Sequence, residues 1–201
     1  FLFLKHYSHH TGRMYSEDRW AVVGEAGPFL DPFYSPGTDF IALANTWTGN
    51  LIERDLSGED VFIHARVFEQ TFQGILENWI PVYLDKYQLM GCSQIMVVKI
   101  FWDWAVYWAF FTLLFTNNAY TDISLLKTLF GTEDSLGSRL KIISDNMQQL
   151  FIDWKEYDTI DFTERYVDPF DIECLKTFHK EMEIQYETNG LLEKVESNLV
   201  V

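Results

Sequence analysis

The sequence predicts an α/β fragment that supplies terminal strands and a ligand loop, followed by a mainly α-helical region. Three observations predict it: strand-like segments before residue 24, a loop rich in glycine and proline after them, and helical spacing of apolar residues from Gly37 onward. We expect the first part to span residues 1–56 and the helical part 57–201. The 201 residues are 48% apolar and 17% aromatic, which is typical of packed globular structure.

Two segments near the N-terminus have the composition of β-strands. They read FLFLKHYS, residues 1–8, and RWAVVG, residues 19–24, and a polar, turn-rich segment separates them. The first segment lacks an initiating Met, a basic region and a small-residue cleavage site, so it does not resemble a signal peptide. We therefore expect the sequence to start inside a strand of a longer protein, as a C-terminal fragment.

The helical part begins with apolar residues that recur at spacings of three and four over residues 61–79, which predicts a helix that Pro81 kinks or ends. Further helices are predicted at 93–116, 135–154 and 170–188. Residues 95–115 could pass for a membrane span, but Lys99 and Asp103 interrupt them. Because these two residues are four apart, they can pair on one face of a helix buried against protein. We expect a core helix and no stable membrane insertion.

Charge and cysteine content narrow the functional classes. The 30 acidic and 15 basic residues give a formal net charge of −15, which repels phosphate backbones and anionic lipid, so we expect no nucleic-acid binding. The two cysteines, Cys92 and Cys174, lie far apart and have no metal-ligand spacing. Such thiols are typical of a reducing compartment, and we expect a cytoplasmic protein.

The segment VVGEAGPFLDPFYSPGTDFIALAN, residues 22–45, carries three glycines and three prolines between a strand-like and a helix-like run. This order of elements is how an open α/β sheet presents a ligand at the carboxyl ends of its strands. Glycines let a flat ligand approach the backbone, and the N–H groups at a helix start near Gly37 carry partial positive charge. The loop predicts a ligand site with a place for negative charge, although Asp31-Pro32 can also be a turn initiator.

These residues also resemble a known motif. GEAGPFLDPFYSPGTDFIALAN looks like the second flavin-binding motif of the flavoproteins related to p-hydroxybenzoate hydroxylase. It is most similar to the flavin-dependent halogenases of the tryptophan halogenase family, where the pattern runs G-D-A-x-x-x-x-D-P-x-x-S-x-G. Upstream, YSHHTGRMYSEDRWAVVG is similar to their strand, turn and strand before the motif. The resemblance covers residues 5 to about 52 and implies the end of a Rossmann-like domain that binds FAD.

The resemblance implies roles for individual residues. Gly24 and Glu25 match the family's Gly-Asp, whose carboxylate accepts hydrogen bonds from the ribitol hydroxyls of the flavin. Gly37 and Thr38 match the helix start that faces the pyrimidine edge, where the reduced flavin becomes anionic. The cofactor-binding residues implied in this way are Gly24, Glu25, Ala26, Pro32, Ser35, Gly37 and Thr38.

The sequence also departs from the family. Pro36 stands where the halogenases usually have Ser or Thr, whose amide helps to hold the halide, and proline has no N–H to donate. Asp39 adds negative charge near the helix start if it faces the site. The G-x-G-x-x-G fingerprint, the catalytic lysine and the W-x-W-x-I-P motif do not occur in the 201 residues, so no catalytic residue can be assigned. Pro36 and Asp39 favour oxygenation or oxidation over halogenation, whereas the missing motifs, which belong to the earlier part of the family's proteins, neither support nor exclude it.

Other constellations are weaker. His6, His9 and His10 resemble metal ligands, but we expect structural or exposed roles for them and predict no metal site. Two pairs spaced by four residues lack further ligands: Asp60 with His64, and His179 with Glu183. Four tryptophans could line a substrate pocket or belong to the core: Trp79, Trp102, Trp104 and Trp108.

The function that these patterns favour is an FAD-dependent oxidoreductase, either a monooxygenase or a halogenase-like enzyme. In it, reduced flavin reacts with oxygen and the helical region holds a small organic substrate. A separate flavin reductase is one option for a partner. The alternative is a non-catalytic helical interaction module that retains an old flavin loop.

Overall fold

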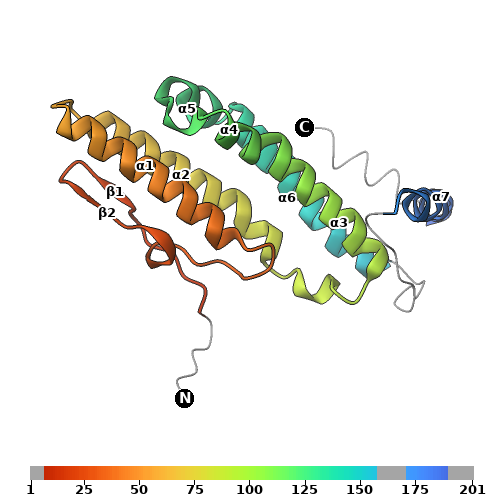
Figure 1. Ribbon diagram of the computed structural model, residues 1–201. Helices are drawn as coiled ribbons and strands as arrows, with labels where there is room; N and C mark the ends of the chain where they lie inside the picture. The colour runs from red at the N-terminus through yellow and green to blue at the C-terminus, as the bar shows by residue number, and fades with distance from the viewer. Residues whose placement is uncertain (1–6, 158–170, 190–201) are drawn as a thin grey trace, which may run out of the picture. The chain divides into compact units, whose positions relative to one another are not determined.

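The computed structural model describes residues 7–157 and 171–189, and in this part of the chain it is mainly helical (Figure 1). The elements are, in chain order, β1 (Tyr15–Ser16), β2 (Trp20–Ala21), the 3-10 helix η1 (Gly24–Ala26), α1 (Pro36–Leu56), α2 (Phe62–Tyr83), η2 (Tyr87–Leu89), α3 (Ser93–Val106), the π-helix η3 (Tyr107–Thr112), α4 (Leu113–Thr116), η4 (Ala119–Thr121), α5 (Ile123–Phe130), α6 (Leu136–Tyr157) and α7 (Ile172–Asn189). By packing, the chain divides into two compact units. Unit 1 is Phe1–Tyr83 with Leu113–Ser138, and unit 2 is Leu84–Thr112 with Arg139–Val201.

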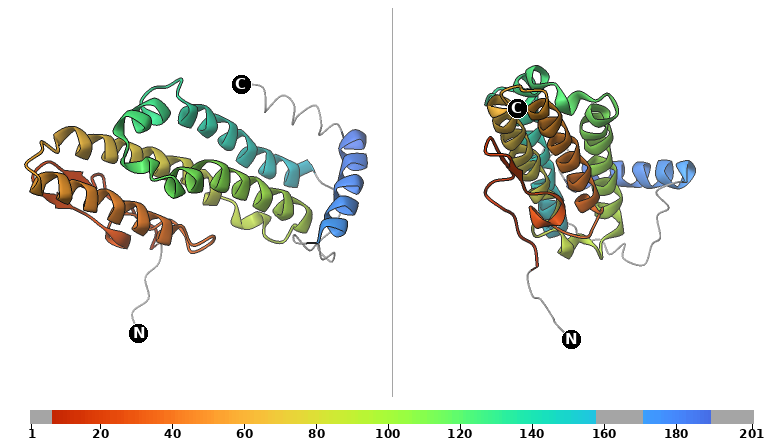
Figure 2. Two further views of the ribbon diagram at one scale, coloured as in Figure 1. Left: turned by 45° about the horizontal axis from the view of Figure 1, so that its top comes forward. Right: turned by 60° about the vertical axis from the view of Figure 1, so that its left-hand side comes forward.

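Unit 1 is built on the antiparallel pair α1 and α2, and the β1–β2 hairpin lies along this pair (Figures 1 and 2). Trp47 of α1 is fully buried at the centre, where its ring stacks on Phe68 and meets Phe72 and Tyr15 edge to face. Its indole Nε1–H donates to the Tyr120 carbonyl at 2.5 Å. Packed aromatic side chains, together with the hydrogen bond of the Trp47 indole, therefore join the hairpin, both helices and η4.

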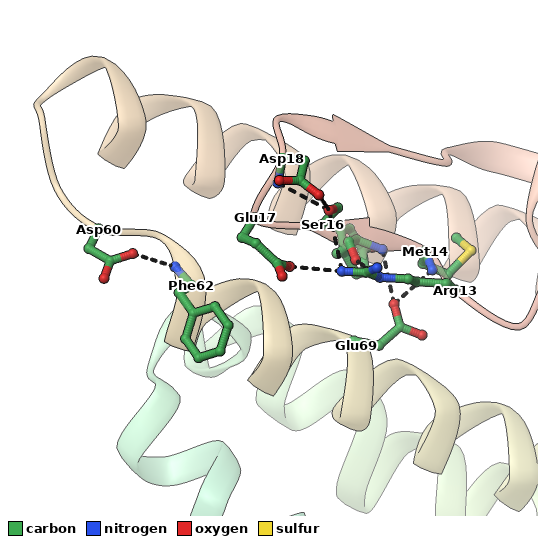
Figure 3. Close-up of polar contacts among 9 residues, drawn as sticks. Arg13, Met14, Ser16, Glu17, Asp18, Asp60, Phe62 and Glu69 are labelled. Atoms are coloured by element: carbon green, nitrogen blue, oxygen red, sulfur yellow. Dashed lines mark hydrogen bonds and ion pairs between the residues drawn. The ribbon is translucent and has the colours of Figure 1, made fainter.

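A single carboxylate anchors the hairpin to α2. Glu69 Oε2 accepts the backbone N–H of Met14 at 2.7 Å and that of Tyr15 at 2.9 Å (Figure 3). Burial, together with the nearby Glu69 charge, raises the pKa of the Tyr15 hydroxyl well above its ordinary value. Gly27 packs against Met14, and an added Cβ there would clash with Met14 Sδ.

The Glu69 anchor gives a stability prediction. Glu69→Ala leaves two part-buried N–H donors without an acceptor, so the free energy of unfolding should fall by about 2–4 kcal/mol. Glu69→Gln keeps one amide oxygen as an acceptor and should cost about half as much. Urea unfolding followed by circular dichroism measures both. Equal stability of the alanine variant and the wild type would show that the two bonds contribute nothing.

Unit 2 is built on the antiparallel helices α3 and α6, which lie side by side (Figures 1 and 2). Its buried apolar core consists of Leu89, Ile95, Val97, Met147, Leu150, Phe151 and Trp154. A polar group lies within the same helix pair. Lys99 Nζ pairs with Asp103 Oδ2 at 2.5 Å, and Gln148 Nε2 donates to Asp103 Oδ1 at 2.7 Å. The pairing of Lys99 with Asp103 that their spacing predicted is confirmed.

The predicted helices are confirmed in position, with three differences. Pro81 lies inside α2, which ends two residues later. The helix predicted over 93–116 contains a π-helical stretch at Tyr107–Thr112. Helix α5 was not predicted, although Asp122 caps its start by accepting the N–H groups of Ser124 and Leu125.

The strand predictions are confirmed only at Trp20–Ala21. In the second predicted strand only Trp20–Ala21 is extended and paired, and its partner Tyr15–Ser16 lies in the segment predicted as a turn. Residues 1–6 of the first predicted strand lie outside the described residues, and Tyr7 and Ser8 are not in a strand. Over residues 7–157 and 171–189 the one sheet is two-stranded and antiparallel, so the Rossmann-like fold stays a prediction. The boundary predicted at residue 56 also stays a prediction, and residues 57–83 pack in unit 1.

The apolar run α3–η3–α4 is less buried than a core helix. Residues Ser93–Thr116 form one helix of 24 residues that is long and apolar enough to cross a membrane, with a mean hydropathy of 1.4 in its most apolar window. Only 17% of that window is buried. This helix is selected by its length and composition alone. Core helices of soluble proteins meet the same two criteria. The expectation of a buried core helix is therefore wrong for most of its surface.

Candidate functional site

The candidate site is the segment from η1 to the first turn of α1, which holds all seven cofactor-binding residues that the resemblance implies. Gly24 opens it with φ +64°, a left-handed conformation that favours glycine. An isolated bridge holds its base, where His9 and Phe29 exchange backbone hydrogen bonds of 2.8 and 2.7 Å. Residues 10–28 therefore form a loop that is closed by this bridge, and Glu25 lies in the loop.

A tight turn then brings the chain to the start of α1. Asp31 Oδ1 accepts the Phe33 N–H at 2.8 Å, which confirms the reading of Asp31-Pro32 as a turn initiator. Tyr34 and Ser35 follow with φ of 63° and 55°, both in the left-handed region that non-glycine residues seldom adopt. Two consecutive residues in this region store backbone strain, and such strain is concentrated at functional segments.

The turn places the Glu25 carboxylate against the start of α1. A Cβ added to Gly37 would lie 3.1 Å from Glu25 Oε1. Helix α1 begins at Pro36, which occupies the first turn and is buried, while Ser35 provides no side-chain cap. Because Gly37 lacks a side chain, Glu25 can lie directly beside the helix N-terminus, whose partial positive charge attracts a carboxylate.

The histidine next to the loop is held by backbone carbonyls. His9 Nδ1 lies 2.8 Å from the Tyr7 carbonyl oxygen, and Nε2 lies 3.0 Å from that of Glu25. The carbonyls of Tyr7 and Glu25 favour the protonated ring and raise the pKa of His9 above its ordinary value. His9 therefore acts as a brace between the bridge and η1, the structural role expected for it.

Most of the candidate residues are exposed to solvent. Five of them are exposed, and they are Glu25, Ala26, Pro32, Ser35 and Thr38. Gly24 and Gly37 are half-buried. The structure brings Glu25 together with Gly37, and Pro32 and Ser35 lie in the turn that connects them. Thr38 points into this turn, because its hydroxyl donates to the Ser35 carbonyl at 2.8 Å.

The weaker candidates do not form sites in the described residues. No cluster of three or more His, Cys, Asp or Glu in that part of the chain could hold a metal ion. Asp60 accepts the Phe62 N–H at the start of α2, and both cysteines are free. Of the four tryptophans, Trp79 is in the core, Trp102 and Trp104 are half-buried, and Trp108 is 63% exposed. His6 and the side chain of Glu183 lie outside the described residues.

Sequence reasoning missed the buried polar group of unit 2. Gln148 is 1% exposed and reaches Asp103 from α6, and its Oε1 has no hydrogen-bond partner among residues 7–157 and 171–189. The spacing of Lys99 and Asp103 predicted their pair because that contact is within one helix. A glutamine 45 residues further along carries no comparable signal.

Comparison with known proteins gives one distant relative. Over 104 residues, 51% of this chain, the sequence is 25% identical to the flavin-dependent halogenase chlA of Dictyostelium discoideum. The chain spans 17% of the length of that relative. No protein-family model and no solved structure matches the chain. The partial similarity suggests the flavin-dependent halogenases and is consistent with a flavin oxidoreductase in general.

Proposed function

We propose that this chain supplies part of the FAD site of a flavin-dependent oxidoreductase, and that residues 24–38 contact the cofactor. One observation carries the proposal: the exposed Glu25 carboxylate lies beside Gly37 at the start of α1. A hydrogen-bond acceptor and a helix N-terminus are thus adjacent without a side chain between them. The partial similarity to a flavin-dependent halogenase supports a flavin cofactor in general, independently of this geometry.

The residues present fit a flavin chemically. The Glu25 carboxylate can accept hydrogen bonds from ribitol hydroxyls, and it is exposed. Gly24 has the left-handed φ of +64° that favours glycine, and Gly37 leaves no side chain between the Glu25 carboxylate and the start of α1. When bound, the reduced flavin would supply the electrons for reaction with oxygen.

The finer assignments rest on the proposed cofactor. We assign a monooxygenase or halogenase-like reaction on a small organic substrate, which the helical region would hold, with a separate flavin reductase as one source of reduced flavin. We also keep the cytoplasmic location as part of this proposal.

Flavin content of the intact protein tests the proposal. Wild-type protein, incubated with FAD and desalted, should retain the visible absorbance bands of bound flavin. Glu25→Ala should lower the affinity for FAD by about tenfold to a hundredfold, because a charged acceptor is lost. Glu25→Asp, which restores the residue common in the family, should bind FAD at least as well as the wild type.

Glu53→Ala is the matched control, since Glu53 is an exposed glutamate further along α1. It should leave FAD affinity and thermal unfolding unchanged. A colourless wild-type protein that takes up no added FAD would overturn the proposal. It would favour the second candidate, a non-catalytic helical interaction module.

A further inference from the structure

The α3–η3 helix of unit 2 has the opposite polarity from that of a water-facing helix. Its charged residues point inward: Lys99 is fully buried, the Asp103 side chain is 6% exposed, and the partner Gln148 on α6 is 1% exposed. Its large apolar residues point outward, with Phe101 39% and Trp108 63% exposed. A helix on the surface of a water-soluble unit normally shows the reverse arrangement.

The outward residues form one continuous face. Phe101, Ala105 and Trp108 are exposed and Trp104 is half-buried, and their spacing i, i+3, i+4 and i+7 runs along one side of the helix from α3 into the first turn of η3. We call these four residues the aromatic face. The rings of Phe101 and Trp104 meet edge to face with centroids 6.3 Å apart. All four residues of the aromatic face are uncharged, and no charged residue occurs from 104 to 121.

We propose that the aromatic face docks on the surface of a zwitterionic lipid bilayer, with α3 lying in the interface plane. Charge complementarity argues for this occupant, since an uncharged face suits uncharged lipid, whereas a net charge of −15 opposes an anionic surface. Tryptophan is enriched at the membrane–water interface because its ring has an apolar body and a polar N–H.

The inner side of α3 decides between lying on the membrane and crossing it. A crossing helix needs lipid or apolar partners all round, and the 24-residue run is long enough for that. The inner side of α3 instead carries an ion pair and the amide of Gln148, and α6 packs against it. Because protein covers this inner side, only the outer side of α3 is left for lipid, and contact on one side alone is how a helix lies in the membrane interface.

Vesicle flotation of the intact protein tests the proposal. The protein should float with phosphatidylcholine vesicles, and Trp108→Asp or Phe101→Glu should reduce the partition coefficient at least about tenfold, because a large apolar contact is replaced by a charge. Leu56→Asp is the matched control, since Leu56 is 82% exposed on α1 and outside the aromatic face. It should float as the wild type does.

Two further measurements separate the proposal from its rivals. Including phosphatidylserine should weaken flotation at low salt, and added salt should restore it. Lipids brominated near the headgroup should quench tryptophan fluorescence, and Trp108→Phe should float normally while losing part of this quenching. Failure of the intact protein to float with phosphatidylcholine vesicles would overturn the proposal. A loss in Leu56→Asp equal to that in Trp108→Asp would also overturn it.

Discussion

Lys99→Met is expected to lower the free energy of unfolding of unit 2 by about 3–5 kcal/mol, because it leaves the Asp103 carboxylate buried without its cation. Lys99 is fully buried and its ammonium lies 2.5 Å from Asp103 Oδ2. The hydrogen bond from Gln148 Nε2 to Asp103 is a single amide contact and cannot replace a full charge. The measurement is urea unfolding of wild type and variant at neutral pH.

The double variant Lys99→Met/Asp103→Leu separates loss of the ion pair from loss of one partner. Removing both charges removes the cost of burying them, so most of the stability lost in the single variant should return. A deficit of about 1–2 kcal/mol should remain, because Gln148 then has no acceptor. A double variant as unstable as the single one would show that packing around Lys99, and not charge, carries the effect.

The same pair makes stability depend on pH. Burial lowers the pKa of Lys99 below its ordinary value of 10.5, and the attraction of Asp103 opposes this only in part. Between the lowered folded-state pKa and 10.5 the unfolded chain binds more protons than the folded one, so stability rises with pH in that window. The stability difference between wild type and the double variant should therefore shift in favour of the wild type as pH rises toward 10.

Local spacing predicted more of this molecule than any other signal. Apolar periods located the long helices, and the four-residue spacing of Lys99 and Asp103 predicted their pair, because each depends on contacts within one helix. Helix α5 could have been found from the Asp122 cap and the apolar run behind it. Its eight residues were too short for the period to stand out.

Contacts between distant residues could not be predicted in this way. The segment of β1, Tyr15–Ser16, was predicted as a turn. Its extended conformation depends on pairing with β2 and on hydrogen bonding to Glu69, which lies 54 residues away from Tyr15. The composition of residues 9–18 does not indicate that the Glu69 carboxylate binds there. The aromatic face was likewise missed, since apolar content predicts burial and does not tell which side of a helix a neighbour covers.

The candidate site shows the same division. The Asp31 turn and the helix start were readable from Pro and Gly positions. The approach of Glu25 to Gly37 depends on the turn between them. In this turn Tyr34 and Ser35 have left-handed backbone conformations, which their residue types do not predict. Only the resemblance to a flavin motif placed these residues together before the structure was known.

We expect the intact protein to bind FAD but to use chloride poorly, because the start of α1 is poor in donors and rich in negative charge. Pro36 provides no N–H, and losing one donor to a buried anion costs about 1–3 kcal/mol, or roughly five- to a hundredfold in occupancy. The structure adds a second reason, since the Glu25 carboxylate already lies beside Gly37. Asp39 places a further acidic residue in the first turn of the helix.

The test is turnover of the reduced enzyme with oxygen and a chlorination probe such as monochlorodimedone, titrated with chloride and bromide. The wild type should show no halide-dependent turnover at millimolar chloride. Pro36→Ser restores an N–H and should raise halide use, and Pro36→Ser with Glu25→Asp should raise it further, because the shorter carboxylate withdraws from Gly37. Pro36→Ala is the matched control that restores the N–H without a hydroxyl, so it should recover the part of the effect that the backbone donor carries. Efficient chlorination by the wild type would contradict the prediction, since a helix start that already holds a carboxylate and lacks one amide should not also hold a halide.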